Sequence, residues 1–114
     1  MNTLVILNDP PYGTERSYNG LRLAKALAKA DTSVTLFLMA DAVTCAKSGQ
    51  KAPQGFYNIE LMLKSVARSG GVLACGTCMD ARGLTDDDIV QGARRSTMPE
   101  LAERTIAADK VLVF

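Results

Sequence analysis

Short apolar runs alternate with segments of helical spacing along the chain, and this alternation limits the possible folds more than any other feature. Thr3 to Leu7 and Ser33 to Met39 are rich in β-branched and apolar residues, as buried strands are. Between them, Thr14 to Ala30 repeats apolar side chains at the three- and four-residue spacing of a helix. Strands separated by helices need crossover connections, so we predict an α/β domain with a mainly parallel sheet and helices on both faces.

The second half of the chain continues this pattern. Helical spacing over Asn58 to Ser69 ends at a glycine pair, and a third strand follows over Gly71 to Ala74. Thr97-Met98-Pro99-Glu100 matches a capping box with proline in the first turn, which predicts a helix to about Ala108. Val111 to Phe114 then forms the final strand.

Shorter features complete the predicted sheet and its connections. Ile89-Val90 is assigned to a short fourth strand, which makes the sheet five-stranded. Lys47 to Gly55 is rich in Ser, Gly, Gln, Lys and Pro, and is expected to be a loop that is either mobile or used for binding. Thr14 is expected to cap the first helix, and Asp41 is expected to cap a short helix after the second strand.

Composition excludes several classes of partner. The chain has 114 residues, enough for one domain with its own core, and a formal net charge of +1, so it lacks the basic excess that binds nucleic-acid phosphates. The first apolar run is too short for a signal peptide, and no segment approaches the roughly 20 apolar residues of a membrane span. We therefore expect a cytoplasmic protein with no nucleic-acid or membrane partner, whose three cysteines are free thiols.

Residue types that are missing narrow the chemistry further. The chain has no histidine, so it contains neither a Cys-His couple nor a Ser-His-Asp triad, and any acid or base must be a carboxylate, thiol, lysine or tyrosine. The turn from Asn8 to Gly13 matches neither the Walker loop nor the dinucleotide fingerprint. Two neighbouring thiols are too few for a closed zinc site. We expect no metal and no cofactor.

The chemistry that remains centres on Cys75-Gly76-Thr77-Cys78. Two thiols three residues apart at the end of a probable strand are expected near the surface, close enough to react or to share a ligand. The alternative is that both are small core residues. Cys45 follows apolar residues on a short predicted helix and is expected to be a buried, unreactive packing residue.

Three polar segments follow the first three predicted strands, and the carboxyl ends of parallel strands are where open α/β sheets bind ligands. If these strands are neighbours, the thiols share a pocket with Tyr12, Gly13, Asp41 and Arg82. An arginine beside a thiol lowers the thiol pKa, although Arg82 is equally consistent with a solvated surface charge. The turn that contains Tyr12 and Gly13 is either an anion site at a helix start or simply a rigid connection.

In combination, these segments resemble the DsrE/DsrF family of small sulfur-handling proteins, and most of all its YchN-like group. The matching motifs are Pro11-Tyr12-Gly13-Thr14-Glu15, Phe37-Leu38-Met39-Ala40-Asp41-Ala42-Val43, Gly49-Gln50-Lys51, Tyr57-Asn58-Ile59, Cys75-x-x-Cys78-x-x-x-Arg82-Gly83, Leu101-Ala102 and Ala108-Asp109-Lys110-Val111. The resemblance spans residues 1–114 and implies one flavodoxin-like α/β domain that assembles into trimers and homohexamers.

The resemblance also implies thiol-based sulfur chemistry. In sulfur-relay members the acceptor cysteine lies eight residues before the glycine of an Arg-Gly pair, a spacing that falls on Cys75, with Cys78 as the additional thiol. The implied function is a persulfide carrier or sulfurtransferase that exchanges sulfur with a donor or acceptor protein. Two alternatives stay open: a thiol-disulfide redox protein that uses both cysteines, and a non-catalytic oligomeric module that binds a small anion.

Overall fold

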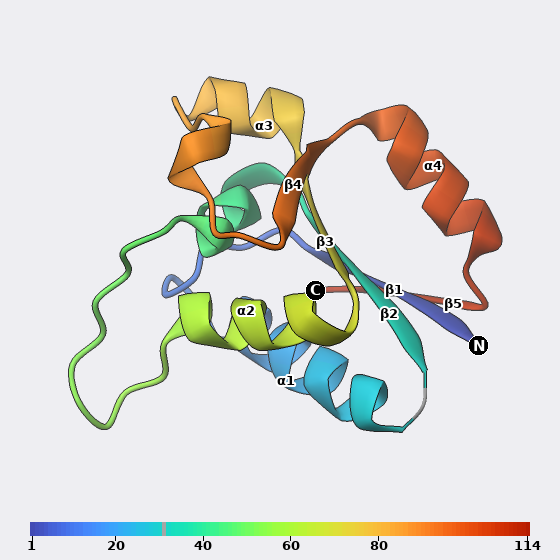
Figure 1. Cartoon of the computed structure of the whole chain (residues 1–114), viewed down its shortest axis with the longest axis horizontal. Coiled ribbons are helices and arrows are strands. Elements are labelled where there is room, and N and C mark those ends of the chain that lie inside the picture. Colours follow the sequence, from blue (N-terminus) through green and yellow to red (C-terminus); the bar gives the residue numbers. More distant parts are fainter. Residues whose placement is uncertain (31) are drawn as a thin grey trace.

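The computed structural model describes residues 1–30 and 32–114, and its centre is a five-stranded, all-parallel sheet (Figure 1). The strands are β1 (Asn2–Leu7), β2 (Ser33–Leu38), β3 (Gly71–Cys75), β4 (Ala93–Ser96) and β5 (Lys110–Val113). They lie in the order β4-β3-β2-β1-β5. The predicted α/β class with a five-stranded parallel sheet is confirmed.

Helices cover both faces of the sheet, as predicted. They are α1 (Arg16–Lys29), η1 (Ala40–Ala46), α2 (Ile59–Ser69), α3 (Gly76–Ala81), η2 (Asp86–Asp88) and α4 (Met98–Ala107), where η1 and η2 are 3₁₀ helices. Because β1, β2 and β3 are added in one direction, right-handed crossovers place α1 and α2 on the same face. The chain then returns from β4 to the far edge through α4, which lies on the opposite face (Figure 1).

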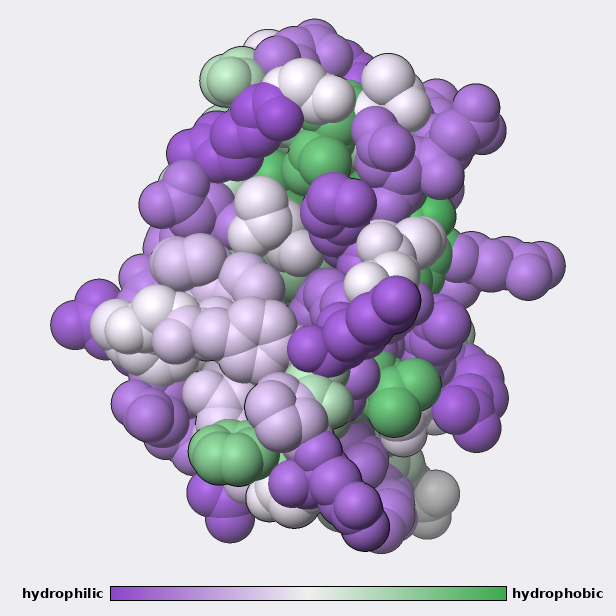
Figure 2. Space-filling model, turned by 90° about the vertical axis from the view of Figure 1, so that its left-hand side faces the viewer, coloured by the Kyte–Doolittle hydropathy of each residue, from purple (hydrophilic) through white to green (hydrophobic). Residues whose placement is uncertain are grey.

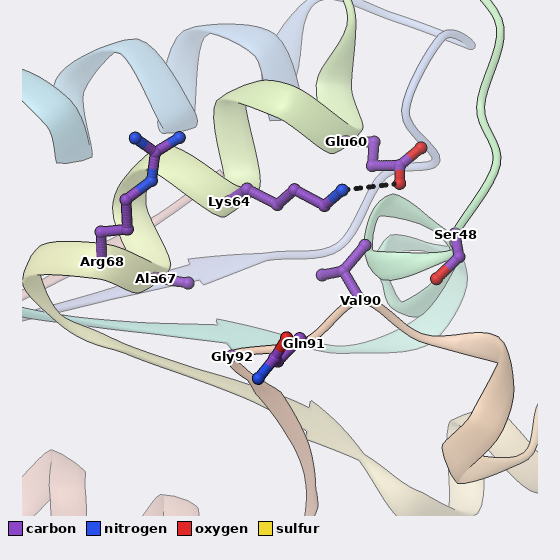
Figure 3. Close-up of a pocket in the computed structure, with 8 residues that line it drawn as sticks. All are labelled: Ser48, Glu60, Lys64, Ala67, Arg68, Val90, Gln91 and Gly92. Carbon is purple, nitrogen blue, oxygen red and sulfur yellow. Dashed lines mark ion pairs between the residues drawn. The ribbon is translucent and has the colours of Figure 1, made fainter.

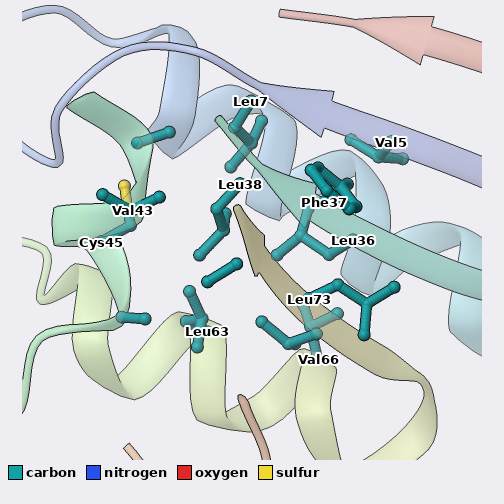
Figure 4. Packing of buried hydrophobic residues seen from close by; sticks show 14 of the residues in the cluster. Val5, Leu7, Leu36, Phe37, Leu38, Val43, Cys45, Leu63, Val66 and Leu73 are labelled. Carbon is teal, nitrogen blue, oxygen red and sulfur yellow. The ribbon is translucent and has the colours of Figure 1, made fainter. Parts of the chain in front are cut away.

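The core fills the space between the sheet and the α1–α2 layer. Leu36 and Leu38 on β2 are fully buried and pack toward Leu63 and Val66 on α2 (Figure 4). Burying each such side chain contributes about 1.5–3 kcal/mol. Leu7 and Leu38 are paired in register, as are Leu38 and Ala74, so the first three strands end at one level and their following segments meet at one edge.

Two details at the helix starts differ from the sequence prediction. Asp41 caps nothing: η1 begins at Ala40 with Met39 in the N-cap position, and Asp41 lies inside the first turn. Thr14 stands one residue before the N-cap of α1, yet its hydroxyl still accepts a hydrogen bond from the Arg16 amide at 3.2 Å. The hydroxyl therefore satisfies one free amide of the helix from outside the helix.

The predicted cap of α4 is confirmed in its first half. The Thr97 hydroxyl accepts a hydrogen bond from the Glu100 amide at 3.3 Å. The Glu100 side chain does not return the bond, because Arg94 and Ser96 hold its carboxylate. Arg94 and Ser96 lie on β4, so the helix start is tied to the sheet.

The fourth strand was predicted at the wrong place. Ile89 forms only an isolated antiparallel bridge with Lys47, and Val90 is buried beside it. The strand is β4, whose sequence Ala-Arg-Arg-Ser has no apolar alternation because it lies at the sheet edge with its arginines in ion pairs. Among the described residues, no helix is both long enough and apolar enough to cross a bilayer.

Candidate functional site

Cys75 is the last residue of β3 and the N-cap of α3, so its side chain lies where the strand turns directly into a helix. Its Sγ is 3.2 Å from the Thr77 hydroxyl oxygen. The residue is only 4% exposed, whereas Cys78 is partly exposed. The expectation that both thiols lie near the surface is therefore wrong for Cys75.

The two thiols have opposite electrostatic settings. Burial acts to raise the pKa of Cys75, but hydrogen bonds from the Thr77 hydroxyl, from the Cys78 amide and thiol, and from the Thr77 amide outweigh it and lower that pKa. Burial raises the pKa of Cys78, and the neighbouring Cys75 adds to this effect. The pKa of Cys75 is therefore shifted downward and the pKa of Cys78 upward, which sets the two thiols apart.

Cys78 lies one turn into α3 and contacts the segment after β2. The Ala40 amide donates a hydrogen bond to its Sγ at 3.2 Å. Ala40 has a φ of 50°, the left-handed region that alanine rarely adopts. The residue with this strained backbone conformation is the same one whose amide donates to the Cys78 sulfur, so backbone strain lies directly beside the thiols.

Arg82 and Asp41 join the same cluster. The Nε and Nη2 atoms of Arg82 lie 2.9 and 2.8 Å from one carboxylate oxygen of Asp41. Nη1 donates to the Cys78 carbonyl at 3.0 Å. The Arg82 charge acts to lower the pKa of Cys78, against the larger opposing effect of burial. The Arg82 charge thus favours the thiolate form of Cys78, while the first backbone amides of α3 favour the thiolate form of Cys75.

Arg95 is the cation that sequence reasoning missed. A Cβ atom at Gly76 would lie 2.9 Å from the Arg95 Nε and 3.1 Å from the Ser96 carbonyl oxygen, so glycine allows β4 to approach the residue beside Cys75. Arg95 is ion-paired with Asp80 at 2.6 Å, which raises its pKa most, and Cys75 contributes to the same shift. Cys75 pairs in register with Ser96, the residue after Arg95. A correct position for the fourth strand would therefore have placed Arg95 near Cys75.

Tyr12 and Gly13 lie apart from the thiols. The Tyr12 hydroxyl donates to the Gln50 side chain at 2.8 Å and accepts from the Ile59 amide at 3.1 Å, and its ring stacks on Tyr57. Gly13 packs against the Pro10 ring. None of these contacts reaches Cys75 or Cys78. The structure brings together Cys75, Cys78, Asp41 and Arg82, whereas Tyr12 contacts the loop before α2 and the first residue of that helix.

Cys45 has the surroundings expected of a packing residue. It is completely buried in η1, and its Sγ lies 3.6 Å from the Asp9 carbonyl oxygen. Burial raises the pKa of Cys45 to about 12. A thiol with this pKa is almost entirely protonated at neutral pH.

A recess of about 520 Å³ lies between α2 and the residues before β4 (Figure 3). Lys64 in this recess is paired with Glu60 at 3.3 Å, and Glu60 also accepts the Gln50 amide at 2.8 Å. The Arg68 side chain turns away from Gln91 (Figure 3). The cations of this recess therefore do not converge on a common point where an anion would bind.

Comparisons with known proteins agree with this fold and cover its full length. A model of the DsrE/DsrF-like family matches residues 1–114. Protein YchN of Escherichia coli is 43% identical over 114 residues, 97% of each chain. An uncharacterized protein of Methanocaldococcus jannaschii is 33% identical over 114 residues, the whole of both chains.

Solved structures give the same result. The crystal structure of the Escherichia coli YchN protein matches with a TM-score of 0.91 and 44% identity over all of both chains. A protein of unknown function from Methanobacterium thermoautotrophicum, only 12% identical, shares the fold with a TM-score of 0.77 over 99% of this chain and 97% of its own. The chain therefore belongs to the DsrE/DsrF-like family.

Proposed function

We propose that this protein is a cysteine persulfide carrier with sulfurtransferase chemistry, and that Cys75 holds the transferred sulfur. One observation carries the proposal: the Cys75 thiol lies at the junction of β3 and α3, where hydrogen bonds from Thr77 and Cys78 lower its pKa. A lowered pKa increases the fraction of Cys75 that is thiolate at neutral pH, and the thiolate is the nucleophilic form of the group. Membership of a family generally linked to sulfur relay supports the same reading.

The transfer needs no metal or cofactor. The Cys75 thiolate attacks the outer sulfur of a donor persulfide, the sulfur–sulfur bond of the donor breaks, and the donor leaves as a thiolate. Cys75 then carries the outer sulfur as Cys–S–SH. An acceptor thiolate attacks that outer sulfur, and Cys75 leaves as a thiolate again. No net oxidation or reduction occurs in the two steps together.

Cys78 determines how long the sulfur stays. If its thiolate attacks the Cys75 sulfur of the persulfide, hydrosulfide leaves and a Cys75–Cys78 disulfide remains. Burial raises the pKa of Cys78 and outweighs the Ala40 amide, whose hydrogen bond acts to lower it, so less of this thiol is thiolate near neutral pH. The raised pKa slows the discharge, which favours carriage of sulfur over its release.

Intact-mass measurement after incubation with a persulfide donor tests the proposal. We expect one added sulfur atom, located on Cys75 by digestion and fragmentation, and removed by a thiol reductant. Absence of added sulfur on Cys75 with a range of low-molecular-weight and protein persulfide donors would overturn it.

A thiol-disulfide redox role is the second candidate, and the effect of each thiol on the pKa of the other favours it. The Cys78 thiol is among the hydrogen-bond donors that lower the pKa of Cys75, so the sulfurs are neighbours. Equilibration with glutathione buffers distinguishes the roles: a redox protein forms the Cys75–Cys78 disulfide at the potentials of known oxidoreductases, with no gain of sulfur.

We also propose a homo-oligomer, a hexamer built from two trimers, in the cytoplasm, where a reducing environment keeps the thiols free. Exposed apolar side chains on α4 and β5 support self-association, namely Met98, Ile106, Val111 and Val113. β5 is also an edge strand, so one side of its backbone is available to another chain.

A further inference from the structure

A groove of about 620 Å³ runs between α1 and α2 and extends to the loop before α2. Side chains from both helices and from the loop line it, on the face of the sheet opposite α4. The cations come from α1, and the aromatic and aliphatic groups come from the loop, from α2 and from Tyr18 on α1. The groove therefore has a charged side and an apolar side.

The charged side is a row on α1. Arg22, Lys25 and Lys29 recur at helical spacing and so project from one side of α1 over about 10 Å. Lys25 and Lys29 also line a smaller recess of about 140 Å³ that extends along the same helix. Within the described part of the chain, no carboxylate lines the groove.

The apolar side is built and partly exposed. Tyr57 stacks on Tyr18 with ring centroids 4.2 Å apart, and the Arg22 guanidinium lies 5.5 Å from the Tyr18 centroid. Phe56 and Leu61 beside them are 71% and 60% exposed. On the side of the molecule that Figure 2 presents, hydrophobic groups stand singly among strongly hydrophilic ones. Stacked rings hold the floor of the groove in place, while Phe56 and Leu61 stay available to a ligand.

We propose that this groove docks an acidic segment of a partner protein that also carries an apolar side chain. The carboxylates of the segment pair with the α1 row, and its apolar side chain packs on Phe56 and Leu61. A row of about 10 Å matches about three residues of an extended chain. Three cations in a chain of net charge +1 are too few for stable nucleic-acid binding, which depends on many phosphate contacts.

In a second copy of this chain the most acidic stretch is η2, and this stretch does not supply such a segment. Its Asp88 carboxylate is already bonded to the Thr85 amide at 2.7 Å. The flanking Leu84 and Ile89 are each only 8% exposed, so this stretch presents no apolar side chain to the groove. Docking at the groove is independent of the thiol chemistry, and Cys75→Ser protein is expected to bind as wild type does.

Fluorescence anisotropy with the full-length protein at low salt tests the proposal. The probe is a short fluorescein-labelled peptide in which glutamates alternate with leucine and phenylalanine. We expect the Lys25→Glu/Lys29→Glu variant to bind at least ~10-fold more weakly, because rim charges guide and hold an oppositely charged partner. The matched control is Lys47→Glu/Lys110→Glu, which changes the net charge equally on exposed residues outside the groove and should leave affinity within about 2-fold.

A second pair of variants tests the apolar side. Phe56→Ser should weaken peptide binding, whereas Leu23→Ser, which removes an exposed apolar side chain of α1 that does not line the groove, should not. Equal losses in groove and control variants, or no peptide binding by wild type, would overturn the proposal. So would tighter binding of a labelled single-stranded oligonucleotide, or of a peptide that copies Leu84 to Val90, since these identify a nucleic acid or a second copy as the occupant.

Discussion

The backbone amide of Ala40 and the sulfur of Cys78 are joined by a 3.2 Å hydrogen bond. The contact links the segment after β2 to α3, and Ala40, which donates the bond, has a φ of 50°. A left-handed alanine costs about 1–2 kcal/mol, so the surrounding structure must offset this cost. The bond distinguishes the two thiols, because Cys78 is held by the neighbouring segment while Cys75 depends on its own helix start.

The first prediction concerns the two thiols of the proposed carrier. Cys75→Ser should abolish sulfur loading from a persulfide donor, because the nucleophile is lost. Cys78→Ser should still load and should hold the persulfide longer, because the thiol that discharges it is gone. Intact-mass time courses measure both effects, with Cys45→Ser as the control. Loading that persists in Cys75→Ser and disappears in Cys78→Ser would reverse the assignment.

Thr77 should control the ionisation of Cys75. Its hydroxyl lies 3.2 Å from the Cys75 sulfur and lowers the pKa of that thiol. A lowered pKa means more thiolate at neutral pH, so alkylation of Cys75 should reach half its maximal rate at a lower pH than alkylation of an unperturbed thiol does. Thr77→Val should move that midpoint upward and slow the reaction at neutral pH, whereas Thr77→Ser keeps the hydroxyl. Identical pH profiles for the two variants would contradict this role.

Cys45 should stay unmodified while the pair reacts. Its pKa of about 12 and complete burial leave almost no accessible thiolate at neutral pH. Limiting iodoacetamide, followed by peptide mapping of the native protein, should find label on the Cys75–Cys78 pair first. Preferential labelling of Cys45 would show that the reactive thiol lies in η1.

Gly76 should tolerate no side chain. An alanine Cβ would stand 3.1 Å from the Ser96 carbonyl oxygen and closer still to Arg95, so Gly76→Ala should destabilise the fold by about 1–3 kcal/mol. Gly71→Ala, where nothing lies within 4 Å, is the matched control and should change stability little. Denaturant unfolding of both variants measures the difference. Equal stability would mean that β4 does not press on the thiol turn.

Self-association should be detectable at micromolar concentration. Ile106 is 87% exposed and Val113 is 65% exposed, and burying them between subunits stabilises an oligomer. Light scattering should give the mass of a hexamer. Ile106→Glu and Val113→Glu should lower that mass without unfolding the subunit, since neither side chain is part of the core. A monomeric wild type would refute the proposed assembly.

Strands and helices were predictable from the sequence where their apolar residues are buried in the core. β1, β2 and β3 consist of apolar runs because helices or neighbouring segments cover them, and α2 repeats its apolar residues because one side faces the sheet. β4 gave no such signal. Its arginines pair with Glu100 and Asp80 rather than with the core, so the sequence points to the apolar Ile89-Val90 as the strand and gives no sign of Arg95 beside the thiol turn.

Within the site, what lay close along the chain was predictable and what lay far apart was not. Cys75, Cys78 and Arg82 fall within two helical turns, so their spacing alone indicated a common neighbourhood. Tyr12 was expected there because β1 ends at the same edge, but hydrogen bonds to Gln50 and Ile59 hold it to the loop before α2. The Ala40 contact likewise depends on how two distant segments pack. The sequence alone determines how far apart neighbouring residues of a helix or turn lie. The course of a loop depends on hydrogen-bond partners that are distant in the sequence and become neighbours only in the tertiary structure.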